Sequence, residues 1–239
     1  MGKINDELTV GAIVAGDYRT AGVFNAHGID FCCRGNRMLR DVCSKMNIDS
    51  NSILEELNSV VAVPDTEDGF NEWDLNRLID YILSKHHQYV RTQVPVIGEF
   101  LEKLCRVHGG NHPELFEVNE LFTQGAANLM DHMMKEENIL FPLVRRLEDD
   151  QRNGVPFSAG GFSVQAPIRV MESEHETEGD RFARIGEVTD GYCVPDDGCT
   201  TYRVAYSMLK DFEIDLHKHI HLENNILFPK AIEMEYELR

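Results

Sequence analysis

The sequence is poor in positive charge and has no long apolar run. It contains 23 lysines and arginines against 41 aspartates and glutamates, which gives a formal net charge of −18. Nucleic-acid backbones are bound by basic patches, so no nucleic-acid partner is expected for a surface of this charge. A membrane-spanning helix needs about 18 or more consecutive apolar residues, and no such run occurs, so no membrane segment is expected either.

Cysteines are few, and no secretory leader is expected. Six cysteines in 239 residues do not make a disulfide scaffold, and in cytosolic proteins cysteines usually serve as reduced thiols, ligands or redox groups. Residues 1–8 are polar and charged and lack the apolar core of a signal peptide. We therefore expect a cytoplasmic protein, and its 42% hydrophobic and 27% charged residues are typical of a globular one.

Apolar residues recur at helical spacing, and no segment alternates in the way that a strand requires. Short patterns over residues 1–63 predict a small helical domain, and residues 64–72, with Pro64 and Gly69, read as a linker. Residues 73–239 carry four long helical patterns. The predicted fold is therefore all-α: a four-helix bundle behind a small helical N-terminal domain.

An eleven-residue motif occurs twice in the bundle region. His132 to Pro142 and His219 to Pro229 both read H-x-x-x-E-x-N-I-L-F-P. Residues i and i+4 lie one turn apart on the same helix face. His132 with Glu136, and His219 with Glu223, can therefore each present an imidazole and a carboxylate to one point.

The other two helices each supply one more histidine in matching order. His87 precedes His132 by 45 residues, and His175 precedes His219 by 44. The predicted metal ligands are His87, His132, Glu136, His175, His219 and Glu223. Imidazole with carboxylate suits iron, zinc or manganese, and a carboxylate can bridge two metals. His86 is an alternative to His87. His217, His221 and Glu137 are expected to point away from the centre, and the two histidines are expected to lie at the surface.

The ligand count indicates a reactive or binding centre. Two six-coordinate metals need roughly twelve ligand positions, of which four imidazoles and two bridging carboxylates fill about eight. A bridging oxygen fills two more and leaves about two for water or a small diatomic ligand, whereas purely structural sites have closed shells.

With these motifs the sequence resembles the haemerythrin-like superfamily, and most closely its iron–sulfur cluster repair branch. Besides the repeated motif, Ile29–Gly35 looks like the paired-cysteine motif of that branch's N-terminal domain, and Val170–His175 looks like its third-helix motif. The resemblance favours His87 over His86, from its position relative to Pro95. Arg34 stands where relatives often have a second glycine, so this turn departs from the family pattern.

The resemblance implies a protein that helps to restore iron–sulfur clusters damaged by oxidative or nitrosative stress. It implies two iron ions per chain, joined by an oxo or hydroxo bridge. It also implies damaged iron–sulfur proteins and small diatomic ligands as partners, and a homodimer. Iron donation, nitric oxide reductase-type activity, or both would fit such a site. The alternative function is binding or sensing of oxygen or nitric oxide, and a structural bundle with fortuitous histidines is the third reading.

Cys32 and Cys33 are adjacent, and a disulfide between neighbours is strained. From the residues alone, one buried and one exposed thiol without a role is the simpler reading. The resemblance instead implies a redox, iron-transfer or nitric-oxide-handling role for the pair. Cys43 and Cys105 fall in apolar helical patterns and are expected in the core.

Overall fold

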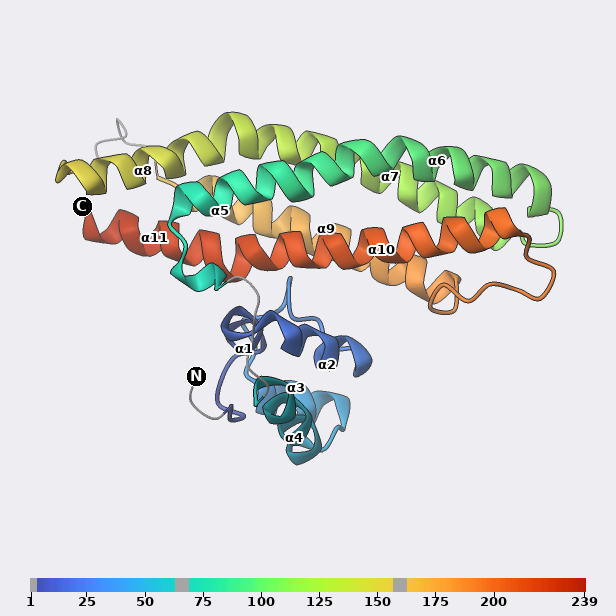
Figure 1. The fold of residues 1–239 in the computed structure, drawn as a ribbon, viewed down its shortest axis with the longest axis horizontal. Coiled ribbons are helices and arrows are strands. Elements are labelled where there is room, and N and C mark those ends of the chain that lie inside the picture. The colour runs from blue at the N-terminus through green and yellow to red at the C-terminus, as the bar shows by residue number, and fades with distance from the viewer. Residues whose placement is uncertain (1–3, 63–68, 157–162) are drawn as a thin grey trace.

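The computed structural model describes residues 4–62, 69–156 and 163–239. Long helices lie side by side, with a group of short N-terminal helices against one flank (Figure 1). Within the described residues every regular element is helical, and Thr9 and Met38 make only an isolated bridge. The all-α prediction is therefore confirmed.

The N-terminal group contains four short α-helices, which are α1 (Val10–Gly16), α2 (Ala21–Ala26), α3 (Leu39–Met46) and α4 (Ser50–Val61). The hydroxyl of Thr9 caps α1 by accepting the N–H of Ala12 at 3.2 Å. Gly28 follows α2 with a φ of 64°, a left-handed conformation that glycine adopts without a steric cost. Local capping residues thus set the ends of helices that are too short to be stable alone.

Of the predicted linker, residues 64–68 lie outside the described residues, and Phe70–Glu72 form a short 3₁₀ turn. Asp74 then begins the bundle, because its carboxylate accepts the N–H of Arg77 at 2.8 Å.

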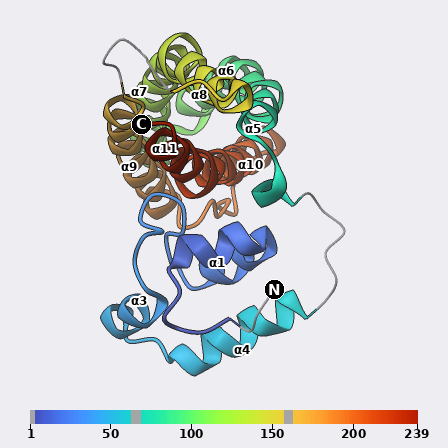
Figure 2. The same cartoon turned by 90° about the vertical axis from the view of Figure 1, so that its left-hand side faces the viewer.

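The bundle consists of four rods that surround a common axis (Figure 2). Three of the rods are interrupted by a five-residue π turn. The first rod contains α5 (Leu75–Ile82), η3 (Leu83–His87) and α6 (Gln88–His108), and the second contains α7 (Glu114–Lys135), η4 (Glu136–Leu140) and α8 (Phe141–Asn153). The third rod is α9 (Gln165–Val188) alone. The fourth contains α10 (Thr200–Leu222), η5 (Glu223–Leu227) and α11 (Phe228–Glu237).

Two of the π turns end two residues before a proline of the repeated motif. Pro142 and Pro229 stand at the start of α8 and α11. Proline has no N–H to donate to the carbonyl four residues earlier, and the wider π turn absorbs this break in the ladder. Neither proline ends its rod, since helix continues to Asn153 and Glu237.

A layer of buried polar side chains divides the interior of the bundle. One apolar cluster includes Val90, Met133 and Phe182 and extends into the N-terminal domain. The second, which includes Ile82 and Met171, fills the opposite end. The repeated His and Glu positions lie where one cluster gives way to the other, and they are themselves buried. None of the described helices is long and apolar enough to cross a membrane.

The N-terminal domain packs on α10 and η5 at one closely fitted point. The side-chain amide of Asn225 donates to the carbonyl of Phe31 at 3.2 Å. The N–H of Gly11 donates to the carbonyl of Gly35 at 2.7 Å. A Cβ on Gly11 would lie 2.2 Å from Asn225 Oδ1, which leaves no room for a side chain there.

Gly11→Ala is expected to destabilise the protein by about 1–3 kcal/mol, because the added methyl group displaces Asn225 from the domain junction. Gly22→Ala is the matched control. A Cβ on Gly22 meets nothing within 4 Å, so the helix-propensity gain should stabilise that variant by about 0.5–1 kcal/mol. Urea unfolding of the three proteins gives both free energies, and equal effects of the two substitutions would contradict the close fit at Gly11.

Candidate metal centre

The structure brings all six residues of the expected ligand set together between the four rods. They form two groups of four, each with ligand atoms within 4.8 Å of one another. One group is His87, Glu136, His219 and Glu223, and the other is His132, Glu136, His175 and Glu223. Both glutamates belong to both groups. This arrangement suits two cations that share two carboxylates.

Each carboxylate turns one oxygen toward each group. Glu136 Oε2 lies 3.3 Å from His87 Nε2, and Glu136 Oε1 lies 3.4 Å from His132 Nε2. Glu223 has the matching arrangement, with Oε1 at 3.0 Å from His219 Nε2 and Oε2 at 3.1 Å from His175 Nε2. The pseudo-two-fold symmetry of the repeat is therefore present in the atoms as well as in the sequence.

The burial of these groups indicates that cations belong among them. Both glutamates are 0% exposed. Both oxygens of Glu136, one oxygen of Glu223 and Nε2 of His87 are buried without a hydrogen bond among the described residues. Buried polar atoms are normally satisfied, and buried charges are paired or coordinate metals. The donor set of imidazole and carboxylate fits iron and its divalent neighbours.

Three of the four histidines are oriented by a second hydrogen bond from Nδ1. His87 donates to Glu137 at 2.7 Å and His132 to Glu174 at 2.9 Å. His175 donates to Asn224 Oδ1 at 2.8 Å. Such bonds fix the tautomer with the Nε2 lone pair available to a metal.

Glu137 lies outside both donor groups, but it still contacts a ligand through Nδ1 of His87. Glu137 and Asn224 each follow a shared glutamate, and each accepts a hydrogen bond from the histidine of the preceding rod. The residue that follows each shared glutamate therefore lies outside the metal layer, but its side chain reaches Nδ1 of a ligand histidine.

The charges of the cluster compensate one another. Burial opposes protonation of His132, but the carboxylates of Glu136, Glu223 and Glu174 together outweigh burial and raise the pKa of His132 to about 9. Burial also opposes ionisation of Glu223, yet the imidazoles of His219 and His175 hold its pKa well below the usual value. Protons on the histidines therefore compete with cations for the same site.

The structure places His87 in the cluster and His86 outside it. His86 is buried, donates through Nδ1 to Asp215 at 2.9 Å, and stacks on His219 with ring centroids 5.4 Å apart. Nδ1 of His219 has no hydrogen-bond partner among the described residues. The fourth histidine thus lacks the orienting acceptor that the other three possess.

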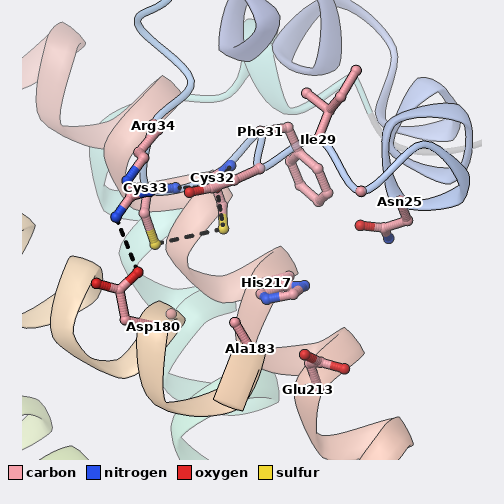
Figure 3. A pocket seen from close by; sticks show the side chains of 13 residues that line it. Asn25, Ile29, Phe31, Cys32, Cys33, Arg34, Asp180, Ala183, Glu213 and His217 are labelled. Carbon is pink, nitrogen blue, oxygen red and sulfur yellow. Dashed lines mark hydrogen bonds and ion pairs between the residues drawn. The ribbon is translucent and has the colours of Figure 1, made fainter. Parts of the chain in front are cut away.

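The expectation that His217 and His221 lie at the surface is wrong. His221 is 1% exposed, accepts from the amide of Asn225 at 3.0 Å, and contacts the ring of Tyr18. His217 is half-buried in the wall of a cavity (Figure 3). Both face away from the metal layer as expected, but that side of α10 is covered by the N-terminal domain.

The paired cysteines lie at this domain junction, next to the metal layer. The thiol of Cys33 donates to the carbonyl of His175 at 3.2 Å, and the side-chain amide of Asn224 donates to the carbonyl of Cys32 at 3.2 Å. Cys43 is buried, as the sequence predicts, whereas Cys105 is only partly buried.

Comparison with known proteins matches both parts of the chain. Residues 78–231 match the haemerythrin HHE cation binding domain, and residues 6–61 match ScdA_N, a domain of unknown function (DUF542). Proteins named iron-sulfur cluster repair protein YtfE from Yersinia pestis (strain Pestoides F) and Yersinia pseudotuberculosis (serotype O:1b, strain IP 31758) are each 33% identical over 234 residues. The matched region covers 95% of this chain and 97% of each relative.

Cation binding to the metal-free protein is expected to strengthen as pH rises toward about 9. A histidine must be neutral to bind a metal, and His132 carries a proton below its raised pKa of about 9. Displacing that one proton weakens the apparent affinity by about tenfold for each pH unit below the pKa. Calorimetric titration in two buffers of different ionisation enthalpy measures the proton release, and cation binding without release at neutral pH would contradict it.

Asn224→Ala is expected to weaken cation binding by about 10–100-fold, because His175 loses the acceptor that orients its ring. Asn138→Ala is the matched control from the other copy of the repeat, since Asn138 is exposed and donates only to the carbonyl of Met134 in its own rod. Competition with a chelator gives both affinities. Equal affinities would show that the Asn224 contact does not orient the ligand.

Proposed function

Because this chain belongs to the iron–sulfur cluster repair protein family and carries its haemerythrin HHE cation-binding domain, we propose that it binds two iron ions and helps to restore damaged iron–sulfur clusters. The single observation that carries the proposal is the sharing of Glu136 and Glu223 between two four-donor groups. A lone cation would use one oxygen of each carboxylate and leave the other buried and uncompensated.

In the proposed centre each iron would be held by two of the imidazoles together with the shared Glu136 and Glu223. His87 and His219 serve one ion, and His132 and His175 serve the other. Four protein donors leave roughly two positions on a six-coordinate ion, one of which an oxo or hydroxo bridge would fill. When bound, the iron pair supplies redox chemistry toward small diatomic molecules, or iron for transfer.

The protein's own part is to hold, orient and shield the pair. Glu137, Glu174 and Asn224 fix three imidazole rings, and the two apolar clusters exclude water from both ends of the layer. In this proposal the clusters are damaged by nitrosative and oxidative stress, and the protein acts as a homodimer. Damaged iron–sulfur proteins are the proposed clients.

One contact favours a second candidate function, which is the sensing of oxygen or nitric oxide. Asn224 joins the ligand His175 to the backbone of Cys32, so a change at the metal would reach the N-terminal domain through two hydrogen bonds. A sensor would bind the diatomic ligand reversibly and pass the change to a partner without restoring clusters.

Repair is tested on an iron–sulfur hydro-lyase inactivated by nitric oxide. Added protein with a reductant is expected to restore its activity, and Glu136→Ala combined with Glu223→Ala should reduce recovery to the level seen without protein, because the shared donors are gone. Glu99→Ala combined with Glu102→Ala removes two exposed glutamates of α6 and should leave recovery unchanged.

Full recovery with the first double variant would contradict the proposal. Reversible nitric oxide binding by the native protein without any recovery would support the sensor instead.

A further inference from the structure

A cavity of about 270 Å³ opens between the N-terminal domain and the bundle, beside α9 and α10 (Figure 3). Cys32, Cys33 and His217 line it together with Asp30, and none of these residues belongs to the ligand set of the bundle. Three of the lining residues form a compact donor cluster. The ligand atoms of Asp30, Cys32 and Cys33 all lie within 4.8 Å of one another.

The spacing of these donors matches that of ligands around one tetrahedral cation. The two sulfur atoms are 3.7 Å apart, and Cys32 Sγ lies 3.5 Å from Asp30 Oδ1. With metal–sulfur bonds of about 2.3 Å and metal–oxygen bonds of about 2.1 Å, tetrahedral angles place two sulfurs about 3.8 Å apart and a sulfur and an oxygen about 3.6 Å apart. A disulfide would need the sulfurs at about 2.05 Å, so the thiols are free.

Hydrogen bonds to the loop backbone hold the Asp30 side chain beside the two thiols. The backbone N–H groups of Cys32 and Cys33 each donate to Asp30 Oδ1 at 3.0 Å. Arg37 binds the backbone carbonyl of Asp30, and Arg34 pairs with Asp180 across the cavity. In the described part of the chain, no lysine or arginine forms an ion pair with the Asp30 carboxylate.

Two residues of the bundle also border the space around the two thiols. Gly179 faces Cys33, and a Cβ there would come within 2.9 Å of the sulfur, so α9 leaves room for this thiol. The imidazole of His217 lies in the cavity wall opposite the cysteines and packs against Phe31. No hydrogen bond from its ring occurs among the described residues, which leaves a further donor facing the cavity.

We propose that Asp30, Cys32 and Cys33 form a second cation site, outside the bundle, which takes one thiophilic divalent cation and keeps its fourth position open to the cavity. Binding forms two metal–sulfur bonds and one metal–oxygen bond, releases the two thiol protons to solvent and transfers no electrons. The identity of the cation as ferrous iron, in passage between the bundle and an acceptor, rests on the proposed function. The site itself stands on the donor geometry.

Cobalt(II) is the probe, because thiolate ligands give it charge-transfer absorption and a tetrahedral site gives it visible bands. Full-length protein with its bundle already loaded with iron and its thiols reduced is titrated without oxygen. One additional cobalt per chain with sulfur charge transfer is expected. Cys32→Ser and Cys33→Ser should each abolish the two-thiolate spectrum, and Asp30→Asn should weaken binding by at least about tenfold.

Two control variants separate the site from its surroundings. Asp180→Asn removes a carboxylate from the same cavity wall, and Cys193→Ser removes an exposed thiol elsewhere. Both should leave the titration unchanged. Absence of sulfur charge transfer in the native protein, or its persistence in both cysteine variants, would overturn the proposal.

Circular dichroism and bundle iron content, measured on the same samples, show that each variant is folded. Low bundle iron together with intact cobalt binding would count against the proposed function alone, and normal bundle iron without cobalt binding would count against the second site alone.

Discussion

Two fully buried carboxylates face four imidazoles inside a largely apolar bundle interior, and the rest of the structure is arranged around that layer. An isolated ion in such an interior carries a desolvation penalty of several kcal/mol. Here each oxygen of Glu136 and Glu223 lies beside an imidazole nitrogen, and the apolar clusters close the layer from both ends. The same carboxylates and imidazoles are suited to bind cations, which displace the protons held by the histidines in the metal-free protein.

The rod formed by α10 and η5 connects this layer to the N-terminal domain. Its inner face carries His219 and Glu223, and its outer face carries His221 and Asn225, which pack against the short N-terminal helices. Asn224 lies between these faces and contacts both a metal-layer histidine and the cysteine loop. A change in the metal layer therefore has a direct route to the cavity that holds the paired thiols.

The sequence was sufficient to predict the helical fold and the convergence of six side chains, because the i, i+4 spacing and a repeat in register both follow from helix geometry. It did not reveal the π turns, since Pro142 and Pro229 indicate a break in the hydrogen-bond ladder but do not specify i→i+5 bonding, and η3 contains no proline. The burial of His217 and His221 was missed because a single helix pattern does not show which face another domain covers. Asp30 was missed because donors in a non-helical loop follow no fixed spacing.

The central claim is that two iron ions share Glu136 and Glu223, and iron X-ray absorption of the purified protein tests it most directly. The account predicts nitrogen and oxygen neighbours together with an iron–iron distance of about 3.5 Å, in the range of carboxylate-bridged pairs. Iron without a second iron within that range, or an iron pair that survives the loss of both glutamates, would contradict it.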